Sequence, residues 1–435
     1  MFERRCLSLR LFYSLLFCIC SLALLTNSAS AKTDLQQLID RTEEGETLHL
    51  PSGTYEGNVL ISKGIEIIAD EGVILEAKSP REAAIIIEAK DVSIEGLEIK
   101  TVGKGVMIRD SENVQLSDLT LEGVRSGIEM YRTKNTEIQD VKVKGNDDHY
   151  SQKGNGVAVF NSENILVKNS RFNTVQDGVY IEHVKEITVQ NIFVENSRYG
   201  THFMYSENVQ AIDNTYTKNV TGLMVMMTKN GTFSNNRIFY QEGFNGTGIT
   251  FYEVQNADIF DNDISGNRVA ITIQRTTGLN IHSNIIQMNQ TAIESIRSDQ
   301  SNIVSRNYLV GNLVNVRSDM KGVSLKENYY DDYAGIDLDN DGIGDESYVA
   351  LQSFGQWMVR KPVYQYYVEA PSVVLLNQID QQTNKAAREL LVDETPTTNF
   401  NIDKNLEFKI HLWQLIAGIV LVVGCLVIWR RSVLS

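Results

Sequence analysis

The sequence predicts an all-β solenoid, a right-handed parallel β-helix with coils of about 22 residues, from three observations. Glycines recur 22 positions apart at Gly178, Gly200 and Gly222, and a fixed period near 20 is typical of stacked repeats. Within each unit, apolar and polar residues alternate in three short runs, which indicates three strands per turn. Asn, Gly, Ser and Asp separate these runs, as turns require.

The same phase continues on both sides of the three glycines, at Gly127, Gly156, Gly248, Ala270, Ala292 and Val314. Two short insertions of 7 and 4 residues explain the longer steps before Gly156 and Gly248. We expect Gly127, Gly178, Gly200 and Gly222 at equivalent corners. An Asn also recurs at one turn of the repeat, at Asn113, Asn135, Asn164, Asn208, Asn230 and Asn256. Because Asn tolerates the left-handed conformation, these residues predict a stacked turn ladder.

Residues 1–31 are predicted to be a secretory signal peptide. Three Arg residues precede an apolar run over 11–25, and Ala29-Ser30-Ala31 follows as the cleavage site. The four Cys residues all fall outside the predicted solenoid, at Cys6, Cys18, Cys20 and Cys425. An exported domain of this kind has no disulfides and no thiolate ligands. A soft metal would therefore have to be held by Met and His.

The remaining chain divides into six predicted parts. Residues 32–63 form an N-terminal cap that begins with a short helix, because the open end of a β-helix exposes strand edges. The β-helix proper covers 64–348, with coils from about Gly64 to Asp332 and an Asp-rich loop at its end. A C-terminal extension, 349–395, contains an amphipathic helix from Pro371 to Leu391. Residues 396–409 serve as a tether, 410–429 as a transmembrane helix and 430–435 as a cytoplasmic tail.

The predicted transmembrane helix fixes the expected location of the protein. Its twenty residues are almost all apolar, Trp413 and Trp429 lie at its ends, and Arg430 and Arg431 follow it. We therefore expect a periplasmic domain anchored to the inner membrane by its C-terminus.

The formal net charge of −15 argues against nucleic acid or an anionic glycan as the partner and favours a cation or a basic protein.

The candidate metal site lies on the outward side of the first strand of two adjacent coils. In the predicted register His202 pairs with Met224, and Met204 pairs with Met226. His183 and Met227 stand at the strand ends as reserve ligands. Thioether and imidazole groups suit Cu(I), so the pattern predicts a shallow, open copper site. The alternative is an apolar docking patch that binds no metal.

A second candidate site is the Asp-rich loop after the last coil. Asp337, Asp339, Asp341 and Asp345 take positions 1, 3, 5 and 9 of a calcium loop, with Gly342 at position 6. Tyr348 stands at position 12, where a bidentate Glu is usual. The loop is thus predicted to bind calcium weakly or, alternatively, to be a turn that closes the last coil.

Several segments resemble the NosD family, exported β-helix proteins that help to mature the copper sites of nitrous oxide reductase. The segments are NYYDDYAGIDLDNDGIGD (328–345), RYGTHFMYSENV (198–209), GLMVMMT (222–228), PSGTYEGNVLI (51–61) and LLVDETP (390–396). Together they span most of residues 45–396. Tyr330 stands where the family more often has Trp, and Ser347 where it more often has Pro. The membrane anchor is a further departure, because the family pattern is often soluble.

The resemblance implies a non-catalytic maturation factor that carries or presents copper. Its implied partners are nitrous oxide reductase, an ABC transporter with NosF- and NosY-type ATPase and permease, and a further copper chaperone. The alternative is a carbohydrate-binding or carbohydrate-active β-helix protein at the cell surface, which would need paired carboxylates. The outward acids Glu129 and Glu182 lie two coils apart, and Asp147, Asp148 and His149 lie in an insertion. The sequence therefore favours a protein that is not an enzyme, with a purely structural surface protein as a third alternative.

Overall fold

The computed structural model describes residues 32–146, 149, 152–243, 246–351, 357–358, 361–367, 370–383 and 391–399. The predicted signal peptide 1–31, transmembrane helix 410–429 and tail 430–435 lie outside these residues, as does most of the tether 396–409. Within the described ranges, no helix is both long and apolar enough to cross a membrane.

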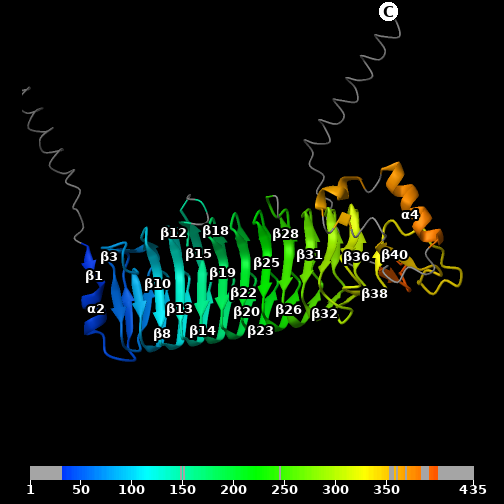
Figure 1. Cartoon of the computed structure of the whole chain (residues 1–435). Helices are drawn as coiled ribbons and strands as arrows, with labels where there is room; N and C mark the ends of the chain where they lie inside the picture. The colour runs from blue at the N-terminus through cyan, green and yellow to red at the C-terminus, as the bar shows by residue number, and fades with distance from the viewer. Residues whose placement is uncertain are drawn as a thin grey trace, which may run out of the picture. The chain divides into compact units, whose positions relative to one another are not determined.

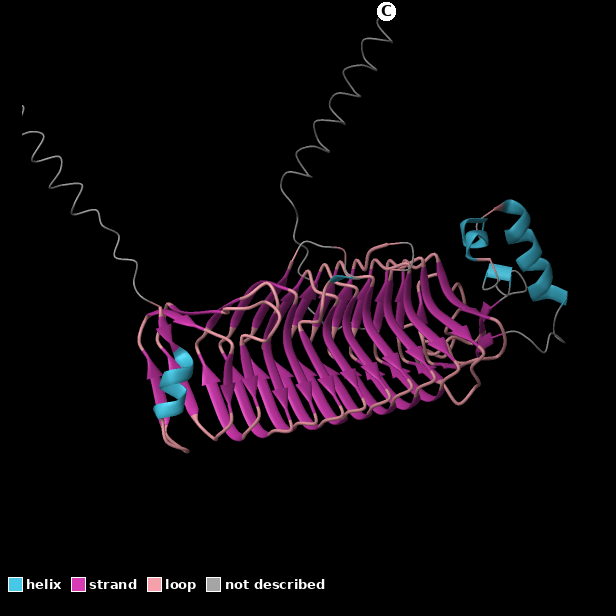
Figure 2. Ribbon diagram, turned by 60° about the vertical axis from the view of Figure 1, so that its left-hand side comes forward, coloured by secondary structure: helices cyan, strands magenta, loops and turns pink. Residues whose placement is uncertain are grey.

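Three long sheets wind around one core, and their strands lie side by side along the stack (Figure 1, Figure 2). We call the 12-stranded sheet the site sheet, the 15-stranded sheet the second sheet and the 14-stranded sheet the third sheet. Each strand pairs in parallel with its counterpart in the next coil, except that β40 and β41 are antiparallel. The predicted all-β, right-handed parallel β-helix is confirmed.

The site sheet contains β4 (Val59–Ile61), β7 (Ile85–Ile87), β10 (Lys104–Arg109), β13 (Ser126–Tyr131), β16 (Val157–Phe160), β19 (Asp177–Glu182), β22 (Tyr199–Met204), β25 (Thr221–Met226), β28 (Thr247–Tyr252), β31 (Val269–Gln274), β34 (Thr291–Ile296) and β37 (Val314–Ser318). The second sheet contains β2 (Thr47–Leu50), β5 (Glu66–Ala69), β8 (Lys90–Glu95), β11 (Glu112–Ser117), β14 (Lys134–Gln139), β17 (Glu163–Lys168), β20 (Lys185–Gln190), β23 (Glu207–Ile212), β26 (Lys229–Ser234), β29 (Gln255–Phe260), β32 (Thr277–His282), β35 (Ile303–Ser305), β38 (Ser324–Lys326), β40 (Tyr348–Leu351) and β41 (Leu391–Asp393).

The third sheet contains β1 (Thr33–Asp34), β3 (Gly53–Glu56), β6 (Val73–Glu76), β9 (Glu98–Lys100), β12 (Thr120–Val124), β15 (Lys142–Gly145), β18 (Arg171–Asn173), β21 (Phe193–Glu195), β24 (Thr215–Thr217), β27 (Arg237–Phe239), β30 (Asp263–Ser265), β33 (Ile285–Gln287), β36 (Tyr308–Val310) and β39 (Tyr329–Tyr330). The helices are α2 (Leu35–Arg41), the 3-10 helix η2 (Pro362–Tyr367) and α4 (Pro371–Thr383).

The core confirms the register that the alternating pattern predicts. Val179, Ile181, Leu223 and Val225 face inward and are fully buried. The predicted glycines take equivalent positions, although each is the second residue of a site-sheet strand and not part of a turn. A Cβ on Gly200 would lie 2.4 Å from the carbonyl oxygen of Gly222, so the coils stack too closely there for a larger side chain without a shift.

The predicted Asn turn ladder is present in the second sheet. Its six members all have positive φ, between 50° and 57°. Exposed amide groups join successive coils; Asn135 Nδ2, for example, donates to Asn113 Oδ1 at 3.2 Å. These Asn residues therefore serve as turn residues, as the sequence indicates.

A second Asn ladder, not anticipated from the sequence, runs through the interior between the second and third sheets. Its rungs are all fully buried: Asn214, Asn236, Asn262, Asn284, Asn307 and Asn328. Each rung after the first accepts a hydrogen bond from the backbone N–H of the preceding rung, as Asn262 Oδ1 does from Asn236 at 2.9 Å, and Asn214 Oδ1 accepts from the Ile192 N–H at 3.0 Å. Its Nδ2 donates to a backbone carbonyl of an earlier coil, as Asn262 does to Phe233 at 2.9 Å. The ladder thereby satisfies buried backbone groups at the corners.

The N-terminal end of the stack begins earlier than predicted. Strands β2, β3 and β4 already belong to the three sheets, so the first coil starts at Thr47 rather than near Gly64. Among the described residues at this end, β1 pairs with β3 in the third sheet and α2 lies over the opening (Figure 1). Asp34 caps α2 by accepting hydrogen bonds from the backbone N–H of Gln36 and Gln37.

The C-terminal extension also differs from the prediction. Helix α4 is described from Pro371 to Thr383, and residues 384–390 lie outside the described part of the chain. Leu391, the predicted last residue of the helix, instead begins strand β41, which covers residues 391–393. This strand pairs in parallel with β38 and antiparallel with β40. Leu391 and Asp393 are buried there, so pairing with the last coil overrides the helical pattern read from the sequence.

Candidate metal centre

Strands β22 and β25 carry the four residues of the predicted copper site, which we call the His–Met group: His202, Met204, Met224 and Met226. His202 pairs in register with Met224, and Met204 pairs with Met226. Neighbouring strands lie about 4.8 Å apart, so the four side chains project from one small area of the site sheet. The predicted pairing is confirmed.

The His–Met group is less open than predicted. His202 is only 6% exposed, whereas the three methionines are partly exposed. Two aromatic rings cover the imidazole edge-on, because Tyr180 and Tyr199 each lie 5.1 Å from its centroid. The imidazole is therefore held in a pocket of tyrosines beside an accessible set of thioethers.

An ion pair between the partly exposed Arg198 and the fully buried Asp177 fixes the orientation of His202. Asp177 is fully buried and its Oδ2 lies 3.1 Å from His202 Nδ1. Arg198 holds the same carboxylate with two hydrogen bonds, from Nε to Oδ1 at 2.8 Å and from Nη2 to Oδ2 at 2.6 Å. The guanidinium also lies over the ring of Tyr199, 4.5 Å from the centroid.

The other imidazole nitrogen, His202 Nε2, is buried and has no hydrogen-bond partner among the described residues. The Asp177 carboxylate accepts hydrogen bonds, so the proton of a neutral imidazole lies on Nδ1 and a lone pair remains on Nε2. Leaving such an atom unsatisfied costs about 1–3 kcal/mol. A carboxylate behind a histidine whose second nitrogen is free is the usual arrangement of a metal ligand, so these residues fit a soft cation such as Cu(I).

Tyr180 links the imidazole to one of the thioethers. Its hydroxyl donates to Glu182 Oε2 at 2.9 Å and lies 3.5 Å from Met204 Sδ. Burial, together with the Glu182 carboxylate, holds the pKa of Tyr180 above its ordinary value. The phenol is therefore neutral at physiological pH and remains a donor.

The two reserve ligands lie at turns, one residue beyond the ends of strands β19 and β25. His183 and Met227 both have positive φ, 53° and 49°. The His183 ring stacks on Tyr205, with centroids 5.0 Å apart and planes 12° apart, and its side chain is half-exposed. His183 thus follows β19 and Met227 follows β25, so neither residue lies within β22 or β25.

Sequence reasoning missed the residues that position His202. Asp177 directly precedes a corner glycine, and Arg198 opens the RYGTHFMYS segment, so both stood beside recognised features. Their role depends on the contact between successive coils at that corner, which the strand pattern alone does not specify.

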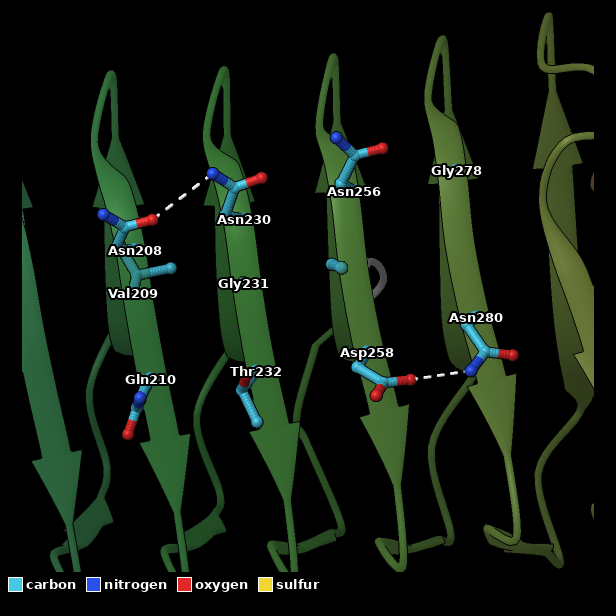
Figure 3. Close-up of a pocket in the computed structure, with 11 residues that line it drawn as sticks. Asn208, Val209, Gln210, Asn230, Gly231, Thr232, Asn256, Asp258, Gly278 and Asn280 are labelled. Carbon is cyan, nitrogen blue, oxygen red and sulfur yellow. Dashed lines mark hydrogen bonds between the residues drawn. The ribbon is translucent and has the colours of Figure 1, made fainter.

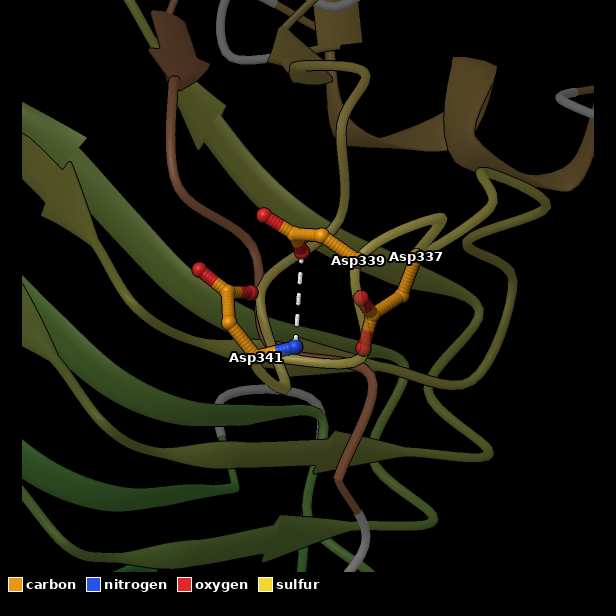
Figure 4. A group of neighbouring side chains, drawn as sticks. All are labelled: Asp337, Asp339 and Asp341. Carbon is orange, nitrogen blue, oxygen red and sulfur yellow. Dashed lines mark hydrogen bonds between the residues drawn. The ribbon is translucent and has the colours of Figure 1, made fainter.

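The Asp-rich loop brings together three of its four predicted ligands. Carboxylate oxygens of Asp337, Asp339 and Asp341 lie within 4.8 Å of one another (Figure 4). Asp345 is used differently, because its Oδ2 accepts from the backbone N–H of Leu338 at 2.7 Å. Asp337 Oδ2 accepts from the Gly342 N–H at 2.9 Å, which closes the loop.

The outward acids considered for carbohydrate chemistry are separately engaged. Glu129 contacts Lys104 Nζ at 2.7 Å and the Tyr131 hydroxyl at 3.2 Å, while Glu182 accepts from Tyr180. Strand β16 separates the strands that carry the two acids. Of the insertion residues, Asp147 and Asp148 lie outside the described part of the chain.

A separate hollow of about 530 Å³ lies on the second sheet (Figure 3). Its lining includes the amide and hydroxyl side chains of Asn208, Asn230 and Thr232. Two hydrogen bonds cross it, from Asn230 to Asn208 at 3.3 Å and from Asn280 to Asp258 at 2.8 Å. Asp258 is the one acid among its lining residues, so this hollow offers no carboxylate pair.

Two family models match the chain. The model described as periplasmic copper-binding protein (NosD) matches residues 139–335, which include the whole His–Met group. A model described as rhamnogalacturonase A/epimerase, pectate lyase-like, matches residues 26–224. The resemblance to NosD that the sequence motifs indicate is thereby confirmed over 139–335.

Among solved structures, similar folds come from carbohydrate-active proteins and an adhesin. The A-module of Azotobacter vinelandii mannuronan C-5 epimerase AlgE6 has a TM-score of 0.54 at 13% identity, covering 68% of this chain and 95% of that one. A PL6 alginate lyase in complex with a trisaccharide has a TM-score of 0.54 at 12% identity, covering 69% and 84%. The Streptococcus pneumoniae surface adhesin PfbA has a TM-score of 0.50 at 12% identity, covering 71% and 90%. At such low identities the likeness shows the fold alone, and no curated protein matches the chain.

Proposed function

We propose that this protein is a non-enzymatic accessory protein that carries or presents Cu(I) on the His–Met group during assembly of the copper sites of nitrous oxide reductase. The NosD match over 139–335 supports a copper-related role in the periplasm. The observation that carries the assignment to these residues is the buried, unpartnered Nε2 of His202, backed by Asp177 and set beside three thioethers. His183 and Met227 are the candidates for a transient ligand at the edge of the group.

The partners of this function follow from the same resemblance. We propose that the protein works with nitrous oxide reductase, an ABC transporter of the NosF and NosY type and another copper chaperone. In the same proposal the apolar segment 410–429 holds the domain at the periplasmic side of the inner membrane.

Replacing two thioethers tests whether the His–Met group binds copper. The Met204→Leu/Met226→Leu double variant keeps apolar bulk and removes sulfur, so its Cu(I) affinity, measured against a competing chelator, is expected to fall about 10-fold or more. A Met288→Leu/Met320→Leu variant is the matched control, because both of these methionines are exposed and lie outside the group.

Two outcomes of this titration decide between copper binding and docking. Equal affinity in the wild type and the Met204→Leu/Met226→Leu variant would exclude these sulfurs as ligands. If the variant also failed to support maturation of the reductase, the same surface would be a docking patch without metal.

The Asp-rich loop is proposed as a weak calcium site. Asp337, Asp339 and Asp341 converge, but the twelfth position is occupied by Tyr348 instead of a bidentate Glu. With a Kd of about 10⁻⁴ M, 10 mM free calcium would stabilise the folded state by about 2.7 kcal/mol. The melting temperature of the wild type should therefore be higher in calcium than in chelator. The same increase is expected for the control variant Asp213→Asn, which is exposed and lies outside the loop, but not for Asp339→Asn/Asp341→Asn. Equal melting in calcium and chelator would leave the loop as a turn only.

Carbohydrate binding or carbohydrate-active chemistry is the second candidate function, because the pectate-lyase-like family model matches residues 26–224. It predicts that the protein binds or depolymerises uronate polymers. Incubation with polygalacturonate and alginate, followed by chromatography of the products and a binding measurement, would separate it from the copper function.

A further inference from the structure

A cleft of about 490 Å³ opens on the site sheet, before the His–Met group along the stack. Ala158 forms part of its floor and pairs in register with Glu129 on one side and Tyr180 on the other. The cleft is present because Ala158 has only a methyl side chain. Glu129 and Tyr180, at the same outward position in the two neighbouring coils, have long side chains.

The lining of the cleft is basic, although the protein as a whole carries a formal net charge of −15. Lys104, Arg125 and Lys153 line it together with one acid, Glu129. Lys104 is paired with that acid at 2.7 Å, and Arg125 is exposed at the rim. A cluster of cations on an acidic surface attracts an anionic group and orients it.

The aromatic residues of the cleft favour a carboxylate over a stacked sugar ring. Tyr131 and Phe160 stack on each other, with centroids 4.8 Å apart and planes 7° apart. Their facing surfaces are therefore occupied by each other, so a sugar ring cannot stack on these two faces. The charge of the cleft then favours an anionic group such as a carboxylate.

The cleft is also joined to the supports of His202. Asn155, which lines the cleft, accepts a hydrogen bond from the Asp177 backbone N–H at 3.2 Å. Gln176, another lining residue, accepts from the Arg198 backbone N–H at 2.7 Å. Strands β16 and β22 are two steps apart, or about 10 Å. A protein partner that buries about 800 Å² on its own side would cover both places at once.

We propose that this cleft binds an acidic segment, rich in Asp and Glu, of the protein that exchanges copper with the His–Met group. The proposal rests on the copper function proposed above and identifies how the partner is recognised. Carboxylates that enter the cleft would fix the partner's register, so that its metal ligands lie over Met204, Met224 and Met226.

A charge reversal in the full-length protein tests this recognition. A fluorescent Glu-rich peptide is titrated at low salt into the wild type and into Arg125→Glu/Lys153→Glu, which should lower its affinity about 10-fold or more. The matched control, Lys229→Glu/Arg237→Glu, makes the same change in net charge on the other two sheets and should bind the peptide like the wild type. Cu(I) affinity should be the same in all three proteins.

Three outcomes would overturn the proposal: no peptide binding by the wild type, equal loss in both double variants, or binding of an oligogalacturonate probe without binding of the peptide. The last result would assign the cleft to a glycan. Peptide binding that depends on Arg125 and Lys153, in a protein that binds no Cu(I), would instead overturn the copper function and leave the recognition of an acidic segment standing.

Discussion

Replacement of Asp393 by Ala is expected to release the C-terminal closure of the β-helix and to destabilise the last coils by about 3–5 kcal/mol. Asp393 is fully buried and ends the interior Asn ladder. Its carboxylate accepts five hydrogen bonds: from the backbone N–H groups of Glu327 (3.1 Å), Asn328 (3.0 Å) and Thr395 (3.1 Å), from Asn328 Nδ2 (3.0 Å) and from the Tyr330 hydroxyl (3.1 Å). Alanine would leave all five donors without an acceptor.

The loss of stability in Asp393→Ala should at first be confined to the last coils, because each coil of a solenoid contacts only its neighbours. Hydrogen exchange should therefore accelerate in β38, β39 and β41 before the middle coils change. The adjacent Glu394→Ala variant removes an exposed carboxyl and serves as the control. If Asp393→Ala left exchange in β38 and β41 unchanged, the carboxylate would not be what holds the C-terminal segment to the stack.

The fold could be predicted because the repeat is local in the sequence. A 22-residue glycine spacing together with alternation inside each strand determines which residues face inward, and hence that His202 pairs with Met224. The Asp393 closure could not be predicted in this way. Asp393 lies 65 residues after Asn328, so no spacing rule connects the two.

The environment of the site was less predictable than its position. The alternating pattern places His202 on the outward side of β22 but does not reveal that Tyr180 and Tyr199 cover it. The interior Asn ladder was missed for a related reason. An Asn at a turn can lie in solvent, like Asn135, or inside a corner, like Asn262, and composition does not distinguish the two.

Asp177→Asn is expected to lower Cu(I) affinity about 10–100-fold, the usual cost of losing a partner behind a metal-binding histidine. The wild-type carboxylate only accepts, so it keeps the His202 proton on Nδ1 and the lone pair on Nε2. An asparagine can present its NH₂ group to the ring, which favours the opposite tautomer. It also gives Arg198 one acceptor oxygen where the carboxylate gives two.

The readouts must separate this effect from a general loss of structure, since breaking a buried ion pair is itself destabilising. Nitrogen NMR of the imidazole in the copper-free protein reports the tautomer directly, and Cu(I) affinity is compared only for variants that remain folded at the assay temperature. Arg198→Lys is the second variant, because it keeps the carboxylate beside His202 while removing the two-point contact. It should retain the wild-type tautomer and most of the copper affinity. A folded Asp177→Asn protein with an altered tautomer and unchanged Cu(I) affinity would show that Nε2 of His202 is not a copper ligand.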